Sequence, residues 1–267
     1  MVKIDIGTAG WDYKDWVGSF YPRKLERSQH LAYYTKYFNI VEINSTFYNL
    51  PSKNMVYNWR TNVPENFRFI VKVWQNITHK MNDPEIDLFI TEFFSVLKSL
   101  KPKIFGFLLQ FPPWFKYSEK HREKLNIMLR KIPSEYKYLI ELRDNSWFNP
   151  EILSTFINSK NIFLATTYKP DLKPYYHKDQ QLYYIRLIGD RELTVFNRIQ
   201  RRQEKAMEHL HENIKRLITV PNIYEIFIIV NNHFAGFAPE SVNELKKKLD
   251  LDYRVFNTQK KIEEFIE

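Results

Sequence analysis

Eight short apolar runs recur along the whole chain, and longer amphipathic stretches separate them. The runs are nearly continuous in apolar and β-branched residues, which is the pattern of strands covered on both faces. Alternation of such strands with helices indicates a parallel sheet. We expect the strands at Lys3–Gly7, Ile40–Ile43, Arg68–Val73, Ile104–Gln110, Lys137–Leu142, Ile162–Thr166, Leu182–Leu187 and Glu225–Val230.

Most of the intervening stretches have the periodicity of half-buried helices. From residue 84 to residue 100, apolar residues recur at spacings of three and four, and Pro84 stands where a first helical residue is expected. The connection Thr167–Gln181 lacks this pattern, and its prolines and tyrosines predict an irregular loop. The expected helices are Ser28–Tyr37, Ser52–Asn62, Pro84–Leu100, Ser118–Arg130, Pro150–Ser159, Arg198–Ile218 and Pro239–Leu249.

Eight strand–helix units in 267 residues match the size of a (β/α)8 barrel, which typically takes about 250 residues. The alternative is a doubly wound open sheet, whose first strand is usually followed by a glycine-rich phosphate turn that opens directly into a helix. Here Gly7-Thr8-Ala9-Gly10 leads instead into the aromatic segment 11–21. The sequence therefore predicts an α/β fold, a (β/α)8 TIM-type barrel forming one domain over residues 1–267, with an irregular connection between strands 6 and 7.

The charge of the chain is unbalanced, with 40 Lys and Arg residues against 31 Asp and Glu residues and a formal net charge of +9. This surplus favours an anionic partner, although it also keeps proteins in solution. The chain has no cysteine, which excludes disulfides, thiolate metal sites and cysteine nucleophiles. Residues 1–5 lack the apolar block of a signal peptide, and no apolar run approaches the ~20 residues that cross a bilayer. We expect a cytoplasmic protein without a membrane partner.

Polar and charged residues stand at the ends of several predicted strands. In a barrel, chemistry is built at the carboxyl ends of the strands. An ionisable residue inside an apolar strand is costly to bury unless it is paired or used. Recurrence at one end of several strands predicts a site, with a ring of structural pairs, such as Glu42 with Lys72 and Glu141 with Arg186, as the alternative. The residues are Glu42, Asn44, Lys72, Gln110, Glu141, Arg143, Arg186, Asn231, Asn232 and His233.

Two further features flank these positions. The segment 11–22 begins with Trp11 and is dense in rings, so it could stack on a sugar or nucleobase or simply pack over the barrel mouth. His79 and His233 follow strand ends, and with Glu42 and Glu141 they could hold a divalent ion. The histidines form no ligand cluster and no nucleotide-cofactor motif occurs, so we assign neither a metal nor a cofactor.

A basic stripe is predicted on one helix. Its members are spaced by three, four and seven residues, so they share one face of the helix expected at Arg198–Ile218. They follow Gly189-Asp190-Arg191, and the loops after strands 7 and 8 of barrels often hold phosphate. The stripe would suit a phosphate or a nucleic-acid backbone, and the alternative is a solvated helix face. The patch consists of Arg191, Arg198, Arg201, Arg202 and Lys205.

Several blocks of the chain match a known pattern. They include Gly7-Thr8-Ala9-Gly10-Trp11, Val41-Glu42-Ile43-Asn44-Ser45-Thr46-Phe47-Tyr48 and Glu141-Leu142-Arg143. Through these blocks the chain resembles the domain-of-unknown-function family 72, also called YecE-like, over nearly its whole length. The resemblance implies a TIM-type barrel and supplies no reaction. Many members have His where Ile188 stands and Asp where the sixth strand ends in Thr166-Thr167, so a role for those groups does not carry over.

The residues at the predicted mouth indicate an enzyme acting on an anionic ligand, phosphate-bearing or nucleotide-like, with hydrolysis or phosphoester chemistry as the first expectation. Glu42 and Glu141 are the acid and base candidates, because nearby cations can separate the pKa values of two carboxyls. One alternative is a carbohydrate-active enzyme with two carboxylates flanking a sugar. Another is a non-catalytic nucleic-acid-binding barrel. The expected ligand contacts are Trp11, Asn44, Lys72, His79, Gln110, Arg143, Arg186, Asn231, Asn232 and His233.

Overall fold

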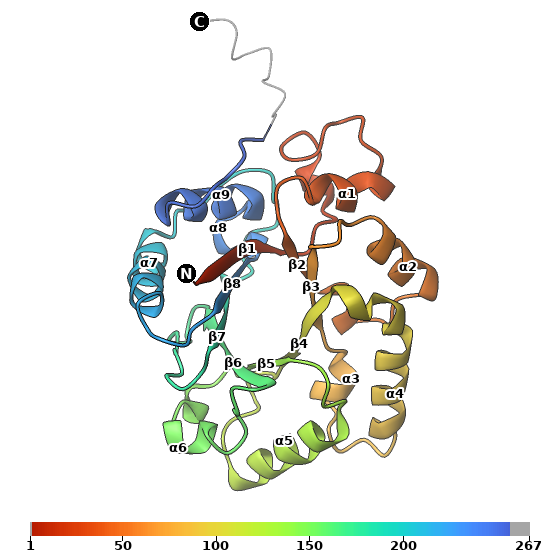
Figure 1. The fold of residues 1–267 in the computed structure, drawn as a ribbon, viewed down its shortest axis with the longest axis vertical. Helices are drawn as coiled ribbons and strands as arrows, with labels where there is room; N and C mark the ends of the chain where they lie inside the picture. Colours follow the sequence, from red (N-terminus) through yellow and green to blue (C-terminus); the bar gives the residue numbers. More distant parts are fainter. Residues whose placement is uncertain (1, 257–267) are drawn as a thin grey trace, which may run out of the picture.

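The structure is a computed structural model that describes residues 2–256. Its parallel strands close into a barrel in which each strand pairs with the next along the chain and the last pairs with the first (Figure 1). The predicted (β/α)8 TIM-type barrel is therefore confirmed. Residue 1 and residues 257–267, which the predicted domain included, lie outside the described part. The strands are β1 (Lys3–Ala9), β2 (Ile40–Ile43), β3 (Arg68–Lys72), β4 (Ile104–Gln110), β5 (Tyr138–Glu141), β6 (Ile162–Tyr168), β7 (Leu182–Leu187) and β8 (Glu225–Val230).

The strands follow the apolar runs of the sequence closely. β2, β4, β7 and β8 have the predicted bounds. Both faces of each run are buried, because the inner faces fill the barrel and the outer faces meet the helices. The connection between β6 and β7 is irregular, as predicted, and contains an isolated antiparallel bridge between Lys169 and Leu172.

The helices surround the ring of strands (Figure 1). Ser52 and Ser118 cap two of them, because each side-chain oxygen accepts a hydrogen bond from the backbone N–H three residues later, at 3.2 and 3.1 Å. Short 3-10 helices lie in the connections: η1 (Lys14–Trp16), η2 (Arg27–Gln29), η3 (Ser45–Phe47), η4 (Lys98–Lys103) and η5 (Asn145–Trp147). The α-helices of the described chain are α1 (His30–Tyr34), α2 (Lys53–Thr61), α3 (Gln75–Thr78), α4 (Ile86–Val96), α5 (Glu119–Lys131), α6 (Pro150–Leu153), α7 (Glu204–Leu217), α8 (Asn232–Ala235) and α9 (Ala238–Lys248).

Several of the predicted helices are too long, and two of them exceed the α-helix by six residues at one end. α7 begins at Glu204 instead of Arg198, because the backbone N–H groups of Gln200 and Arg201 donate to the carbonyl oxygen of Ala235, at 2.8 and 3.2 Å. α6 ends at residue 153 instead of 159. Further along, the side chain of Asn158 accepts hydrogen bonds from three following backbone N–H groups and forms a turn into β6. Both segments satisfy their backbone groups outside a helix.

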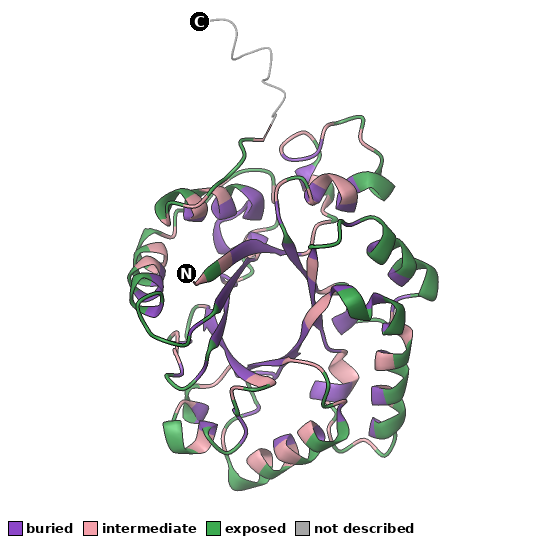
Figure 2. Cartoon of the chain, viewed as in Figure 1, coloured by how far each residue is buried: buried purple, intermediate pink, exposed green. Residues whose placement is uncertain are grey.

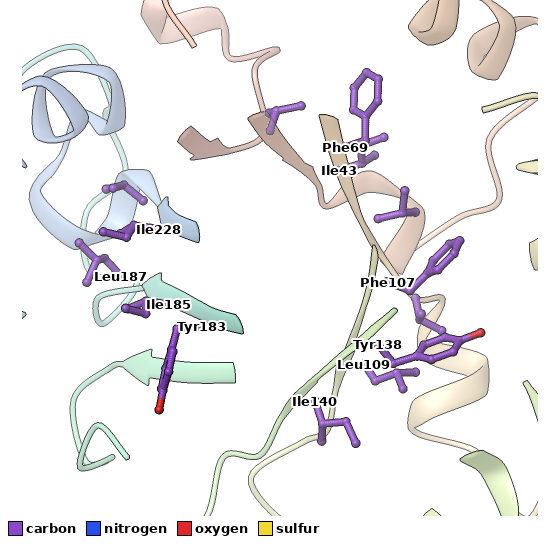
Figure 3. Packing of buried hydrophobic residues seen from close by; sticks show 14 of the residues in the cluster. Ile43, Phe69, Phe107, Leu109, Tyr138, Ile140, Tyr183, Ile185, Leu187 and Ile228 are labelled. Atoms are coloured by element: carbon purple, nitrogen blue, oxygen red, sulfur yellow. The ribbon is translucent and has the colours of Figure 1, made fainter. Parts of the chain in front are cut away.

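The alternation of side chains along the strands produces two cores. The smaller core fills the barrel with residues such as Ile70, Leu108 and Leu139. The larger one lies between the barrel and the helices, and Figure 3 shows Phe69 and Phe107 on the outer side of their strands. In Figure 2 the strands are buried while the helices expose their outer sides. A polar residue that continues the inner series therefore lies within the barrel.

The amino end of the barrel is closed by its own ion pairs. Arg68 binds Asp5 and Glu225, the latter with 2.6 Å between Nη1 and Oε1, and its guanidinium lies 4.7 Å from the centre of the Phe227 ring. The charges at that end are therefore mutually engaged.

Candidate functional site

A cavity of about 470 Å³ lies at the carboxyl end of the barrel. Its walls come from strand ends and from the loops that follow β1, β2, β5, β7 and β8. The structure therefore brings together eight of the predicted residues, which are Asn44, Lys72, Arg143, Arg186, Arg191, Asn231, Asn232 and His233. The remaining lining residues are Tyr13, Tyr48, Ile188 and Phe196.

The charged residues at the strand ends extend the inward-facing series of the barrel. On β2 the buried core residue Ile40 points inward, so Glu42 two residues later lies on the same side. The same step leads from Ile70 to Lys72 on β3 and from Tyr184 to Arg186 on β7. The pleat of the strands therefore gathers these side chains in one layer above the apolar barrel core.

Arg186 holds two carboxylates at once. Its Nε lies 2.8 Å from Oε2 of Glu42 and its Nη2 lies 2.6 Å from Oε1, which is a bidentate pair. Its Nη1 donates to Oε2 of Glu141. The hydroxyl of Tyr184 donates to Glu42, and Nε of Arg143 lies 2.5 Å from Oε1 of Glu141. Both carboxylates are completely buried, so this network lies at the base of the cavity and neither carboxylate lines it.

The network holds Glu141 and Arg186 in their charged forms. Burial alone would raise the pKa of Glu141, but Arg143, Arg186 and Lys72 lower it to about 2. Burial would lower the pKa of Arg186, but Glu141 and Glu42 raise it well above its usual value. At neutral pH the layer therefore carries fixed charges of both signs.

Lys72 has a different environment from the two arginines of the layer. Among the described residues it forms no ion pair, and its Nζ lies 3.9 Å from the centre of the Phe47 ring. Its own carbonyl oxygen accepts a 2.6 Å hydrogen bond from the hydroxyl of Thr46, which joins the end of β3 to η3. Burial, together with the neighbouring Arg186 and Arg143, lowers the pKa of Lys72 to about 7 despite the carboxylates.

Burial and nearby cations also lower the pKa of two histidines near the mouth. Burial, with the charges of Lys72 and Arg143 acting in the same direction, lowers the pKa of His79 to about 4. Burial also lowers the pKa of His233, with Arg191 acting in the same direction. Both imidazoles are therefore neutral at pH 7.

The wall formed by α8 presents polar atoms without partners in the described chain. Oδ1 of Asn232 accepts from the Trp16 indole N–H at 3.1 Å and from the backbone N–H of Ala238 at 3.0 Å. Its Nδ2 and the Nδ1 of His233 are buried and have no hydrogen-bond partner there. Buried polar atoms of this kind are usually satisfied, so these two atoms are exceptions in the described chain.

Three predicted ligand contacts lie elsewhere. Trp11 packs edge-on against Trp59, with 5.9 Å between ring centres, and does not line the cavity. Gln110 is buried, and its amide donates to the carbonyl oxygen of Phe111 at 3.2 Å. His79 lies in an adjacent depression with Trp114, where Thr78 hydrogen-bonds to its Nδ1. Gln110 stands two residues after the inward-facing Leu108, but its amide and the His79 ring are engaged by neighbouring protein groups.

The predicted basic stripe is not one helix face. Arg198, Arg201 and Arg202 precede α7, and Lys205 alone of the four lies on it. Arg201 is engaged by acidic neighbours, since it pairs with Asp190 and, at 2.9 Å, with Glu192. The periodic spacing failed here because the backbone of this segment is fixed by α8 instead of by helical hydrogen bonds. Arg191 is the member of the patch that lines the cavity.

The cavity also has aromatic walls that were not predicted as site residues. Phe196 lies 4.9 Å from the His233 ring and 6.2 Å from Tyr13, measured between ring centres. The backbone N–H of Phe196 donates to Asp15 at 2.9 Å, so the loop after β7 is tied to the loop after β1. The aromatic density of residues 11–22 was the available signal for Tyr13, whereas Phe196 stands in a stretch without periodicity.

The described residues contain no group of three or more His, Cys, Asp or Glu side chains arranged to hold a metal ion. Across residues 2–256, none of the helices has both the length and the apolar character needed to span a bilayer.

Comparison with known proteins gives matches over the whole barrel. The chain is 24% identical to the UPF0759 protein YunF of Bacillus subtilis (strain 168), over 94% of this chain and 96% of that protein. It is 32% identical to the UPF0759 protein YecE of Escherichia coli (strain K12), over 54% of this chain and 50% of that protein. The crystal structure of a DUF72 family protein from Thermotoga maritima matches with a TM-score of 0.76 at 26% identity, covering 93% of this chain and 99% of that one.

A DUF72 family protein from Enterococcus faecalis has the same fold, with a TM-score of 0.73 at 23% identity over 94% of this chain and 99% of that one. The model of the family described as "Protein of unknown function DUF72" matches residues 5–264. That match covers all of the barrel strands except the first two residues of β1, together with every residue that lines the cavity, and it confirms the resemblance indicated by the sequence blocks. The chain belongs to the DUF72 family.

Proposed function

We propose that the cavity at the barrel mouth binds a small phosphate-bearing molecule and that the protein is an enzyme acting on it there. One observation carries this proposal: the cavity lining contains Lys72, Arg143, Arg186 and Arg191 but no acidic side chain. The two carboxylates of the layer lie beneath the cavity and are already bound. The surface that faces a ligand is therefore positive.

The form of the cavity agrees with such a ligand. Its volume of about 470 Å³ lies within the usual range for small-molecule sites. Guanidinium groups bind phosphate through paired N–H donors, and Asn44, Asn231 and Asn232 add amide groups to the same wall. Tyr48 and Phe196 offer aromatic surface for the uncharged part of the molecule.

The predicted acid and base roles of Glu42 and Glu141 have less support than anion binding. A general acid or base must reach the reacting group, and neither carboxylate lines the cavity. In this proposal they are positioning residues, because they fix the guanidinium of Arg186 and, for Glu141, that of Arg143. The same burial removes the basis of the carbohydrate alternative, which needs two carboxylates facing a sugar.

Titration of the protein with inorganic phosphate in a calorimeter tests the proposal. Arg191 forms no ion pair among the described residues, so Arg191→Gln removes a cavity charge without leaving a buried carboxylate unpaired. We expect phosphate affinity to fall about tenfold in this variant, because a charge-assisted hydrogen bond is worth about 1.5–3 kcal/mol. Arg202→Gln, also an arginine but outside the cavity, is the matched control and keeps the wild-type affinity. Equal affinities of all three proteins would contradict the proposal.

A further inference from the structure

Lys72 differs chemically from the other cations of the cavity. Arg143 and Arg186 each hold a buried carboxylate, whereas the amine of Lys72 has no carboxylate partner among the described residues. An arginine stays protonated under all physiological conditions, but a lysine amine can lose its proton and then attack an electrophile. Lys72 is therefore the cation of this layer that can become a nucleophile, and it lines the cavity, which neither carboxylate does.

The position of Lys72 suits an attack on a bound molecule. It is the last residue of β3, and the hydrogen bond from Thr46 to its carbonyl oxygen fixes the start of the side chain. The Phe47 ring lies against the amine on one side, and the cavity lies on another. The side chain is 6% exposed, so a ligand would meet it in a largely dry environment.

The surrounding charges determine the protonation state of this amine. The groups that act on it are Arg186 on β7, Glu141 on β5, Glu42 on β2 and Arg143 after β5, while neutral His79 lies nearby after α3. Burial and the two guanidinium groups outweigh the two carboxylates, which gives the amine a pKa of about 7. At pH 7 about half of the Lys72 amines are neutral, a fraction roughly a thousandfold larger than for an ordinary lysine.

We infer that Lys72 is a nucleophile that forms a Schiff base with a small phosphorylated aldehyde or ketone held in the cavity. This inference rests on the proposed function, because the arginines bind the phosphate that directs the carbonyl toward Lys72. Lysines beside another cation or in a desolvated pocket are activated in this way for carbonyl chemistry. The inference assigns Lys72 a covalent role and narrows the ligand class from phosphate-bearing molecules to those that also contain a carbonyl group.

The step balances without any redox partner. The neutral Nζ attacks the carbonyl carbon, a C–N bond forms, and the π electrons of the carbonyl move to its oxygen. The nitrogen then loses a proton to solvent and the oxygen takes one from solvent, which gives a neutral carbinolamine whose nitrogen has a lone pair. Its hydroxyl then leaves as water after taking a proton from solvent, while the nitrogen lone pair forms the C=N bond. The product is a protonated imine, which draws electrons from the neighbouring carbon and favours loss of a proton or a carbon substituent there.

Borohydride trapping at pH 7 tests this inference. The full-length protein is incubated with glyceraldehyde 3-phosphate and sodium borohydride, and the adducts are assigned to lysines by peptide mass spectrometry. Lys101, whose side chain is 52% exposed, is the internal reference for an ordinary surface lysine. We expect Lys72 to be modified at least about tenfold faster than Lys101 because of its larger neutral fraction. Lys72→Met must abolish the fast adduct, and Lys101→Met, the matched control, must leave it unchanged.

Two comparisons separate this inference from the proposed function. Glyceraldehyde without phosphate should modify Lys72 at least about tenfold more slowly, and excess inorganic phosphate should slow the phosphorylated probe, because one charge-assisted contact accounts for about that factor. Equal labelling of Lys72 by both aldehydes would overturn the proposed ligand class. If calorimetry shows phosphate binding but Lys72 reacts no faster than Lys101, the Schiff base is wrong while the anion site stands.

Discussion

Removal of the Arg186 guanidinium is the most direct perturbation of the buried layer. In Arg186→Gln both Glu42 and Glu141 lose their shared partner while they stay completely buried. The cations hold the pKa of Glu141 at about 2 instead of 4.5, which corresponds to roughly 3 kcal/mol of stability at neutral pH. Leaving a buried carboxylate without its partner typically costs about 3–5 kcal/mol. We therefore expect Arg186→Gln to lower the free energy of unfolding at pH 7 by about 3–5 kcal/mol.

The pH dependence gives this prediction a sign as well as a size. A carboxyl whose folded pKa is lowered stabilises the protein above its unfolded pKa, and this contribution is lost as the pH falls through the folded value. For Glu141 of the wild-type protein, that loss falls between about pH 4.5 and pH 2. Without Arg186, Glu141 loses one of the cations that lower its pKa, so its pKa in the folded variant is higher than in the wild type. The stability deficit of the variant should therefore be largest at neutral pH and shrink as the pH falls through the range between the two folded pKa values.

Urea unfolding followed by tryptophan fluorescence measures both effects. The matched control is Arg143→Gln, because Arg143 binds Glu141 alone and its side chain is 10% exposed. We expect Arg143→Gln to lower the free energy of unfolding by less, about 1–2 kcal/mol, since Glu141 keeps its ion pair with Arg186. The comparison needs equal urea dependence in all proteins, which shows that only stability has changed. A loss of stability below about 1 kcal/mol for Arg186→Gln, or a stability deficit that grows in acid, would contradict the role of Arg186 as the shared partner of two buried carboxylates.

Two further variants probe the rest of the site. Gly189→Ala should lower the free energy of unfolding by about 2 kcal/mol or more. Gly189 has a φ of 78°, and a Cβ at this position would overlap the carbonyl oxygen of His233. A thermal midpoint equal to that of the wild-type protein would contradict this prediction. Lys72→Met should raise the stability at pH 7 by at least about 1 kcal/mol, because the folded state no longer desolvates an amine whose pKa it lowers to about 7. The stability of the wild-type protein relative to the variant should increase as the pH rises from 7 toward 10.5, where the lysine of the unfolded chain also loses its proton. Urea midpoints of both proteins at pH 7 and pH 9 measure this stability difference. A difference that is the same at the two pH values would contradict the prediction.

The fold could be predicted because its determinants are local. A parallel barrel strand is buried on both faces, so it consists of a short run of apolar residues, and such runs can be recognised in the sequence. The end of a helix is less visible when tertiary contacts fix it. At Arg198–Gln203 the spacing is helical, yet the carbonyl oxygen of Ala235 binds two backbone N–H groups of this segment and delays α7 to Glu204.

The gathering of the charged residues at one mouth could be predicted, and so could the pair of Glu141 with Arg186, which the structure contains. The partner of Glu42 could not. Placing charged residues at the ends of several strands was sufficient to gather them at one mouth, since parallel strands present their carboxyl ends together. The suggested pair of Glu42 with Lys72 assumed that neighbouring strands pair their charges. The structure instead pairs Glu42 on β2 with Arg186 on β7, because a long guanidinium side chain reaches through the barrel interior to a strand that is not its neighbour. The order of the strands does not predict which strand a long side chain will reach across the barrel.

The balance of charge in the layer separates a site from a ring of structural pairs. A ring that served only to close the barrel would need as many carboxylates as cations, as at the amino end, where Asp5 and Glu225 pair with Arg68 and Lys3. Buried pairs contribute little net stability compared with apolar packing, so stability alone gives no reason to bury them. At the mouth, the carboxylates fix two guanidinium groups and leave Lys72 without an acidic partner in the described chain. Lys72 lines the cavity, and the proposed binding of an anion there would give a reason for burying a cation without an acidic partner.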